Sequence, residues 1–499
     1  MNAQQNKPLQ PPNASPEQSQ LKFDTEEFDK YIPEATRQFG YLTNDGVEIT
    51  KLNFIGVGWI FSRMFGLVYL PEEDTVWYKN DQGCWRNIPE EIICAQINEF
   101  LTRYFNQKGR HIGFKAKASM AKEILNQVKN FSRQPGFFKN RQGEFILHCR
   151  NCFLVYDAEA GEWIPKPLDT NDIHSRNQLN VDYDPNAKAP RFVNELLGKA
   201  LDKSDNCVFF AYSGQVFLGR NLSQTMLIIS GAAGSGKSTA VNVIEKLVGE
   251  DNATELRTDA LRGFYEIGRY KDKTLLIGRD VSADFLKVKG AEYLKKLTGG
   301  DNVVVERKHS NFVGSYRGNL NVIVISNTHQ PIRIEGDRDA WERRVRTIQF
   351  HAPETPIEPI QEFDAILADE EGSGILNLAL EGLTRIIQSG GKLEAGERQL
   401  QQIKDLLDES ESVKVFTREC VELDESGKDN VTTMELYDAY CEYSRSRGWD
   451  PLPFSKASKQ FPDAMASAFK VEASTDIMRN GSNKRGYRRV RIKSDNQNV

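Results

Sequence analysis

Long hydrophobic runs, paired cysteines and an excess of positive charge are all missing from this sequence. No apolar run in the 499 residues approaches the roughly 18 residues that a membrane-spanning helix needs. The N-terminus lacks the charged and then apolar pattern of a secretion signal, so we expect a cytoplasmic protein that has no membrane partner. The seven cysteines are odd in number and scattered, which favours free thiols over a disulfide framework.

The charge balance excludes a chain coated in basic residues. The 65 Lys and Arg residues are outnumbered by 70 Asp and Glu residues, which gives a net charge of −5. A local basic channel remains compatible with this total, because the distribution of charge matters more than its sum. The segment "HCRNC" has CxxC spacing, but no second ligand pair follows at zinc-finger spacing. We therefore expect Cys149 and Cys152 to be buried apolar residues rather than metal ligands.

Composition and periodicity divide the chain into four parts. Residues 1–22 are nearly all polar or proline and predict a disordered tail. Residues 23–195 mix strand and helix patterns, which predicts an N-terminal domain of mixed α/β structure. Residues 196–392 alternate strand and helix signals, which predicts a mostly parallel sheet covered by helices. Residues 395–499 combine helical patterns with a basic end.

A phosphate-binding motif stands in the third part. The residues "GAAGSGKS" match the pattern GxxxxGK[ST] between a strand pattern and a helix pattern. The glycines let the backbone turn its N–H groups around phosphate oxygens, and the following helix adds its positive end. Lys237 is expected to reach the β- and γ-phosphates of ATP, and Ser238 to hold Mg²⁺. The predicted ligand-binding residues are Gly231, Ala232, Ala233, Gly234, Ser235, Gly236, Lys237 and Ser238. The competing interpretation is a glycine-rich turn without a ligand.

Three further features follow the motif in the order that phosphoryl transfer needs. The strand pattern "KTLLIGRD" ends in Asp280, a candidate Mg²⁺ anchor, with Asp284 as the alternative. The strand pattern "NVIVISN" ends in Asn327, which is placed to hold a water molecule or the γ-phosphate. The segment "DAWERRV" offers Arg343 and Arg344 for stabilising transition-state charge. Each signal is weak alone, and their order gives them weight.

This order of motifs resembles superfamily 3 helicases, which are AAA+ ring ATPases of viruses, phages and plasmids. The block "YLKKLTGGDNVVVERKH…VIVISNTHQPIRIEGDRDAWERRVRTIQF" is similar to the primase-helicases of poxviruses and satellite phages. The resemblance implies an α/β fold with an AAA+ P-loop core, an N-terminal accessory (collar) domain and a C-terminal appendage.

The resemblance also implies roles for single residues. Lys237, Ser238 and Thr239 match the P-loop, and Asp280 matches the acid on the Mg²⁺ side. Asn327 matches the sensor amide. The second residue of the arginine doublet, Arg344, matches the finger that reaches a neighbouring subunit's ATP better than Arg343 does. This chain has Arg279 before Asp280, where the family often shows an acid or a pair of acids.

The stretch "VVVERKHSNF" at residues 303–312 predicts a strand followed by a charged turn. Taken alone, it would be a solvated hairpin. It lies between Asp280 and Asn327, however, and resembles the DNA-contacting hairpin of papillomavirus and polyomavirus initiator helicases. We therefore expect Arg307, Lys308 and His309 to contact DNA, with Lys308 and His309 at the tip.

The last part of the chain carries a basic segment. Residues 479–493 hold seven Lys or Arg and no acid, and a helix pattern precedes them. The order helix, strand, basic loop, strand predicts a winged-helix-like domain, with Lys484, Arg485, Arg488 and Arg489 as DNA-binding residues. A solvated charge run is the competing interpretation.

Together these features imply an ATP-dependent replicative DNA helicase of a mobile genetic element. By family precedent it would be a homohexameric ring that moves 3′-to-5′ on single-stranded DNA at forks. No primase region is evident, so a separate primase or polymerase would be a partner. One alternative is an AAA+ initiator or loader that binds or melts origin DNA without processive unwinding. A P-loop kinase is a second alternative, disfavoured by the basic hairpin and C-terminus.

Overall fold

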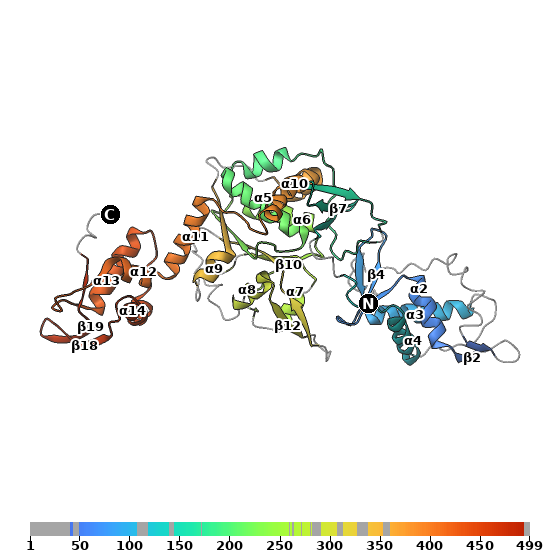
Figure 1. The fold of residues 1–499 in the computed structure, drawn as a ribbon, viewed down its shortest axis with the longest axis horizontal. Helices are drawn as coiled ribbons and strands as arrows, with labels where there is room; N and C mark the ends of the chain where they lie inside the picture. The colour runs from blue at the N-terminus through green and yellow to red at the C-terminus, as the bar shows by residue number, and fades with distance from the viewer. Residues whose placement is uncertain are drawn as a thin grey trace, which may run out of the picture. The chain divides into compact units, whose positions relative to one another are not determined.

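The fold is described for most of the chain. The computed structural model describes residues 40–42, 49–106, 118–138, 144–170, 172–258, 260–261, 264–270, 272–279, 281, 291–306, 313–326, 338–352 and 360–493. Two compact units are present: Met1–Val155 with Pro165–Gln178, and Tyr156–Ile164 with Leu179–Val499. Figure 1 follows the elements along the chain. No helix within the described ranges is long and apolar enough to cross a membrane. The predicted tail, residues 1–22, lies outside these ranges.

The first unit is mixed α/β, as predicted for the N-terminal part. Its elements are β1 (Gly40–Leu42), β2 (Ile49–Leu52), α2 (Phe54–Met64), β3 (Val68–Leu70), β4 (Thr75–Lys79), β5 (Trp85–Ile88), α3 (Glu90–Asn106), α4 (Ala118–Phe131) and β6 (Ile146–His148). Strands β7 (Phe153–Asp157) and β8 (Glu162–Lys166) each cross a boundary between the units in the sequence. The core is formed by apolar faces of α2, α3 and α4. Cys149 and Cys152 are buried in the turn between β6 and β7.

The second unit is built on the parallel sheet that the alternating pattern predicted. The strands are β9 (Met226–Gly231), β10 (Ala253–Glu255), β11 (Leu275–Gly278), β14 (Asn321–Ile325) and β15 (Val345–Phe350). They lie in the order β10-β11-β14-β9-β15, and every pair is parallel. Because both faces are covered by other elements, the strands are nearly continuous runs of buried apolar residues.

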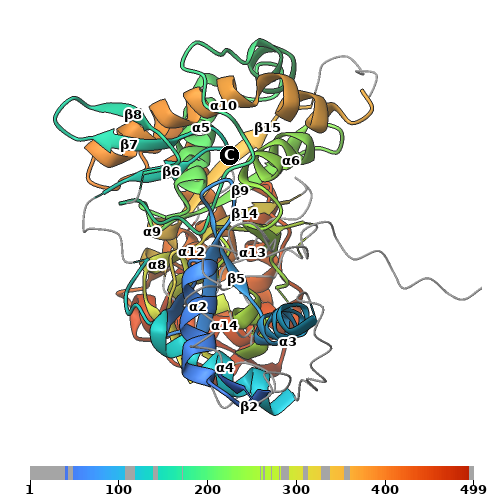
Figure 2. The ribbon, with the colours of Figure 1, turned by 90° about the vertical axis from the view of Figure 1, so that its right-hand side faces the viewer.

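Helices complete this unit. They are the π-helix η2 (Phe192–Leu197) and the α-helices α5 (Lys203–Leu218), α6 (Lys237–Val248), α7 (Phe264–Tyr270), α8 (Ala291–Gly299), α9 (Arg338–Arg344), α10 (Phe363–Gln388) and α11 (Glu397–Ser410). Figure 2 shows α10 lying along α5 and α6. The α5–α10 crossing requires glycine, because a Cβ atom at Gly214 would lie 2.3 Å from the carbonyl oxygen of Ala379.

Helix α11 packs against β15, one of the two edge strands of the sheet. The Thr347 hydroxyl donates to Gln402 Oε1 at 3.2 Å, and Gln402 Nε2 donates to Gln349 Oε1 at 3.3 Å. Asp205 of α5 is fully buried and accepts bonds from the Gln349 backbone N–H and the Gln399 side chain. Burial raises the pKa of Asp205. These polar contacts hold α11 against the core. They also cover the edge strand β15, whose backbone N–H and C=O groups would otherwise be open to another strand.

A hairpin stands where the charged stretch predicted one. Strands β12 (Asn302–Glu306) and β13 (Val313–Arg317) pair antiparallel, with Glu306 opposite Val313. Residues 307–312 connect the two strands. The predicted DNA-contacting residues Arg307, Lys308 and His309 therefore belong to this connection and lie outside the described residues. The paired strands confirm the hairpin and leave the role of its tip as a prediction.

The C-terminal elements enclose a hydrophobic core of their own. They are α12 (Ser412–Cys420), β16 (Val421–Leu423), β17 (Asn430–Thr432), α13 (Thr433–Ser446), α14 (Phe454–Phe469), β18 (Ala473–Arg479), β19 (Ser482–Arg488) and β20 (Val490–Ile492). Strand β19 lies between β17 and β18 in an antiparallel sheet. Asn480 and Gly481 make a two-residue turn in which both have positive φ. The predicted helix and two strands are present, but the connection is too short to hold the basic residues, and three of the four predicted DNA-binding residues, Lys484, Arg485 and Arg488, lie on β19.

Candidate nucleotide-binding site

The P-loop motif lies where its sequence context predicted, between a strand and a helix. Strand β9 ends at Gly231, and α6 begins at Lys237. Gly231 pairs with Phe350 of β15, and a Cβ atom on Gly231 would lie 2.4 Å from the Phe350 carbonyl oxygen. Gly234 and Gly236 have φ values of 76° and 86°, which side chains other than glycine rarely adopt. All three glycines are therefore required by the backbone path of the loop.

The lysine of the motif is folded into its own loop. Its ammonium donates to the carbonyl oxygens of Gly231 and Ala232, both at 2.7 Å, and to Ser235 Oγ at 3.4 Å. Only 6% of Lys237 is exposed, and burial lowers its pKa. No carboxylate in the described ranges pairs with it. Since charged oxygens are stronger acceptors than carbonyls, an arriving phosphate competes well for these donors.

An upstream segment forms one wall of the loop. Leu196 of η2 is buried, and a Cβ atom on Gly236 would lie 2.8 Å from Leu196 Cδ1. Helix η2 is held in turn by the buried carboxylate of Glu371 on α10. That carboxylate accepts the backbone N–H groups of Arg191 at 2.9 Å and Phe192 at 2.8 Å. No local sequence signal marks this contact, because it joins segments far apart in the chain.

The strands that precede the predicted acid and amide end at the same edge of the sheet as the P-loop. Strands β11 and β14 run parallel to β9, and the Ser326 backbone N–H donates to the Ile229 carbonyl at 2.8 Å. Open parallel sheets bind ligands outside the carboxyl ends of strands, where the strand order reverses. The P-loop strand is at such a point, with β14 on one side and β15 on the other. Asp280 and Asn327 themselves lie outside the described residues, as does Asp284.

Arg279 stands where the resembled helicases often have an acid, and it is hydrogen-bonded to α6, the helix that follows the P-loop. Its NH2 group donates to Asn242 Oδ1 at 3.0 Å and to Glu245 Oε2 at 2.5 Å, and both acceptors are on α6. The guanidinium is partly exposed, with 35% of the side chain accessible. Arg279 thus joins the end of β11 to α6, a role that the sequence alone did not suggest.

The arginine doublet ends helix α9, directly before β15. Arg343 is exposed, and its Nε donates to the Asp339 carbonyl at 3.2 Å. Arg344 is half-buried, and its NH1 donates to the Ala340 carbonyl at 3.3 Å. A Cβ atom on Gly299 would lie 3.2 Å from NH2 of Arg344. Arg343 is therefore the more accessible residue of the doublet, whereas the resemblance in the sequence favours Arg344 as the finger.

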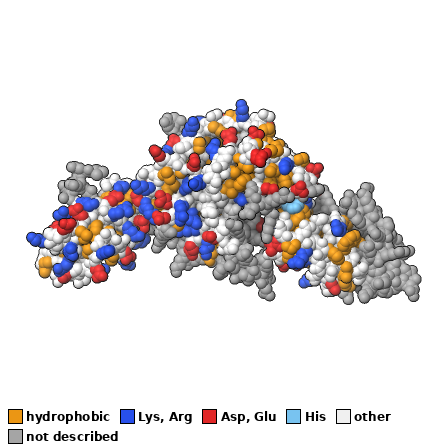
Figure 3. All heavy atoms as spheres, viewed as in Figure 1, with side chains coloured by type: hydrophobic (Ala, Val, Ile, Leu, Met, Phe, Trp, Pro, Cys, Tyr) orange, Lys and Arg blue, Asp and Glu red, His pale blue; other side chains and the backbone are white. Residues whose placement is uncertain are grey.

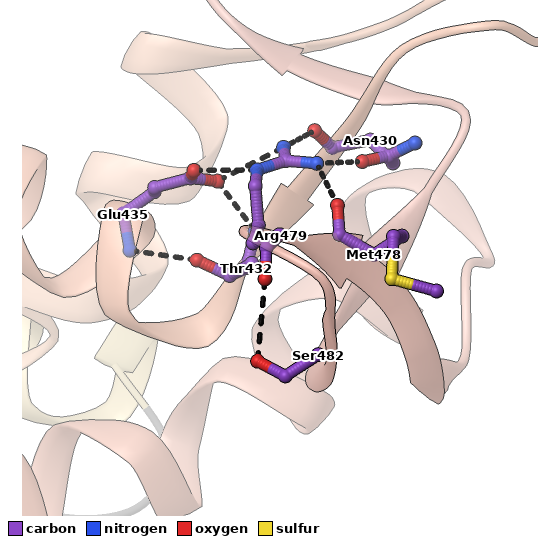
Figure 4. Close-up of polar contacts among 6 residues, drawn as sticks. All are labelled: Asn430, Thr432, Glu435, Met478, Arg479 and Ser482. Carbon is purple, nitrogen blue, oxygen red and sulfur yellow. Dashed lines mark hydrogen bonds and ion pairs between the residues drawn. The ribbon is translucent and has the colours of Figure 1, made fainter.

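The basic C-terminal segment is partly neutralised by ion pairs. Figure 4 shows Arg479 bonded to the Glu435 carboxylate (Nε to Oε1 at 2.8 Å) and to Asn430 (NH1 to Oδ1 at 2.7 Å). Glu435 also accepts the Thr432 backbone N–H at 2.8 Å and so completes the capping box of α13. Arg488, one of the predicted DNA-binding residues, pairs with Asp476.

The other three predicted DNA-binding residues of this segment are exposed. Lys484 and Arg485 lie on β19, and Arg489 follows it with a φ of 61°. Successive residues of a strand point to opposite faces, so Lys484 and Arg485 project from different faces of the sheet. Figure 3 shows Lys and Arg side chains interspersed with Asp and Glu over the C-terminal elements. The predicted DNA-binding residues therefore do not form one basic patch on a single face of the sheet.

Together, the fold and site define an α/β protein whose glycine-rich loop lies at the carboxyl edge of a parallel sheet. Comparison with known families places two matches on it. Residues 60–201 match the family described as "D5 N terminal like", and residues 228–344 match a family of unknown function, DUF5906. The first match covers most of the predicted accessory region and agrees with the resemblance to primase-helicases. The second runs from β9 to the end of α9, and so includes the P-loop and the arginine doublet.

Solved structures of the C-terminal region of NrS-1 are similar at low sequence identity. The A form apo structure is 14% identical with a TM-score of 0.45, over 84% of this chain and 95% of that one. Two apo structures of residues 305–718 are 12% and 13% identical, each with a TM-score of 0.48, over 86% of this chain and 98% of theirs.

Proposed function

We propose that this chain is an ATP-dependent DNA helicase of superfamily 3 that serves replication of a mobile genetic element. The observation that carries the proposal is the P-loop at the carboxyl edge of the parallel sheet. The strands leading to Asp280 and Asn327 end at that edge, and the arginine doublet leads into the neighbouring strand. The D5 N terminal like match upstream supports the same assignment.

Nucleotide binding would begin with the loop lysine. Lys237 exchanges its carbonyl partners for β- and γ-phosphate oxygens, and the amino end of α6 adds its partial positive charge. The loop fits this ligand because its glycines leave the backbone open and its buried ammonium has no carboxylate partner among the described residues. Ser238 and Asp280 would hold Mg²⁺, which supplies charge neutralisation at the phosphates when bound. Asn327 would orient the attacking water.

Transition-state charge would be stabilised across a subunit interface. A finger supplied in trans requires head-to-tail packing, and a closing rotation makes that arrangement a ring. We assign the finger to the exposed Arg343, with Arg344 packed beside Gly299 of its own subunit. Six subunits is the number that the family resemblance implies.

DNA would be contacted at two places. The connection between β12 and β13 would place Lys308 and His309 on single-stranded DNA in the ring channel, where Lys308 binds phosphate by charge. The C-terminal helices and the β18–β19 hairpin form a winged-helix-like appendage, in which Lys484, Arg485 and Arg489 are available for phosphate contacts. A separate primase or polymerase would complete the replication machinery.

Mass measurement tests the assembly and ATPase assay tests the chemistry. Wild-type protein is weighed with and without a non-hydrolysable ATP analogue and single-stranded DNA, and ATP hydrolysis is then measured on the same sample. The proposal predicts a closed oligomer and hydrolysis stimulated by DNA. A monomer under all conditions, or hydrolysis indifferent to DNA, would contradict it. A strand-displacement assay on the same sample then distinguishes the alternatives, because hydrolysis without strand separation would favour the initiator or loader.

A further inference from the structure

Arg346, the second residue of β15, is a half-buried arginine without an ion-pair partner in the described part of the chain. Its NH1 group donates to two carbonyl oxygens in the last turn of α9, Glu342 at 3.3 Å and Arg343 at 3.4 Å, and to the carbonyl oxygen of Val345, the first residue of β15, at 2.8 Å. Its Nε donates to the Leu393 carbonyl at 3.3 Å. One guanidinium therefore joins the end of α9 to the segment between α10 and α11.

The physical chemistry of this contact is that of a helix cap. The last carbonyls of a helix have no partner within the helix and carry its partial negative charge. A guanidinium satisfies several of them at once, because its donors form a rigid planar fork. Burial lowers the pKa of Arg346, which reflects the cost of placing a charge there without a carboxylate. The contact therefore fixes one end of α9 with a charged group whose burial costs free energy.

The opposite end of α9 is fixed as well. Arg338 NH2 lies 2.7 Å from Asp408 Oδ1 on α11, and Asp408 is only 5% exposed. Between these two anchors the helix presents Arg343 to solvent. A short helix held at both ends can hold an exposed guanidinium in a constant direction, which is what a group acting on another subunit requires.

We propose that Arg346 is a positioning residue for the arginine that α9 supplies to the neighbouring subunit. The inference rests on the proposed function, and it concerns how the finger is held rather than which chemistry it serves. Loss of the guanidinium leaves the α9 carbonyls without donors, so the helix end frays and Arg343 loses its fixed direction. The effect falls on hydrolysis at the next subunit's site, because the P-loop of the altered subunit is unchanged.

Steady-state kinetics give the first test, with the full-length variants Arg346→Gln and Arg346→Lys. Misplacement of a catalytic group by about 1 Å costs up to about a hundredfold in rate, so kcat for Arg346→Gln is expected to fall between about tenfold and a hundredfold. KM for ATP and binding of a fluorescent ADP analogue should stay at the wild-type values. Arg346→Lys should retain an intermediate kcat, because one ammonium reaches fewer carbonyls. The control is Arg385→Gln, which alters an exposed arginine on α10.

Mixed assemblies give the decisive test. Arg346→Gln subunits have an intact P-loop and a misplaced finger arginine. Lys237→Ala subunits have a defective P-loop and a correctly placed finger arginine. In randomly mixed equimolar rings, about a quarter of the interfaces pair a sound P-loop with a sound finger. Mixing the two impaired proteins should therefore restore about a quarter of the wild-type rate.

Three results would overturn the inference. Wild-type kcat in Arg346→Gln would show that the finger needs no such anchor. A lowered kcat in Arg346→Gln that mixing with Lys237→Ala does not restore would show that Arg346 acts within its own subunit. Wild-type protein without ATPase activity would remove the proposed function itself, and the inference with it.

Discussion

The P-loop and the basic C-terminal segment hold their positive charge in opposite ways. The Lys237 ammonium is buried, and its acceptors are uncharged oxygens of its own loop. Arg479, Arg488 and Arg491 are half-exposed or exposed, and each is paired with a carboxylate. A charge held by carbonyls remains available to an arriving phosphate, while a charge paired with a carboxylate is already neutralised. A count of basic residues is therefore a poor guide to where an anion binds.

Replacing the P-loop lysine should cause the largest loss of activity among the substitutions at these two regions. Lys237→Ala removes the ammonium that is proposed to bind the phosphates of ATP. Loss of one such donor costs at least about a hundredfold in kcat. ATP hydrolysis and any strand separation should fall together in assays on the same preparation. Lys246→Ala is the matched control, because Lys246 lies on the same helix and is exposed. Equal activity of Lys237→Ala and wild type would remove the loop from the mechanism.

Arg343 and Arg344, the adjacent arginines at the end of α9, should differ in the defect that their loss causes. Arg343→Ala should lower kcat by about tenfold or more with an unchanged melting temperature, because its guanidinium is exposed. Arg344→Ala should lower the melting temperature as well, because its side chain packs beside Gly299. ATPase kinetics and differential scanning calorimetry on both variants check this. A catalytic defect confined to Arg344→Ala would return the finger role to Arg344, as the family pattern suggests.

Within the C-terminal segment, exposed and paired basic residues should contribute unequally to DNA affinity. Replacing both Lys484 and Arg485 with Ala should weaken binding and lower the salt dependence by roughly 0.7 to 0.9 per lost phosphate contact. Arg488→Ala should change affinity less, because Asp476 already neutralises that guanidinium. Fluorescence anisotropy at several salt concentrations measures both. Equal losses in the two variants would show that ion pairing does not remove a residue from DNA binding.

The smallest expected effect concerns the network around Arg479. The hydrogen bond from Arg479 lowers the pKa of Glu435, so its contribution to stability is complete above the ordinary value of 4.5 and is lost as pH falls through the lower folded-state pKa. Glu435→Gln should cost about 1 kcal/mol near neutral pH, as expected for a helix cap and a partly exposed ion pair. Chemical denaturation at pH 7 and pH 3 checks the difference, which should shrink at the lower pH. A difference that grows at pH 3 would contradict this account.

The sequence predicted the parts of the site that depend on local pattern. Glycines at fixed spacing, a strand before them and a helix after them located the P-loop, and alternation of strand and helix predicted the parallel sheet. The paired strands on either side of residues 307–312 were predicted in the same way. Such features are encoded over a few neighbouring residues, so composition and periodicity reveal them.

Contacts between distant segments could not be predicted in this way. Leu196 beside Gly236, Arg279 on Glu245 and Arg346 on the end of α9 depend on how whole elements pack. The basic C-terminal segment shows the same limit, because its sequence contains no acid, and its ion-pair partners come from other strands and helices. Side-chain pairing across a fold has no periodic signature in the chain.

Strand displacement on a forked DNA substrate tests the central claim most directly. Wild-type protein is incubated with ATP or a non-hydrolysable analogue, and release of the annealed strand and phosphate are followed together. The account predicts strand release with ATP alone, and hydrolysis without release for Lys308→Ala. Phosphate release by the wild type without any strand release would contradict a helicase and leave an ATPase that loads or melts DNA.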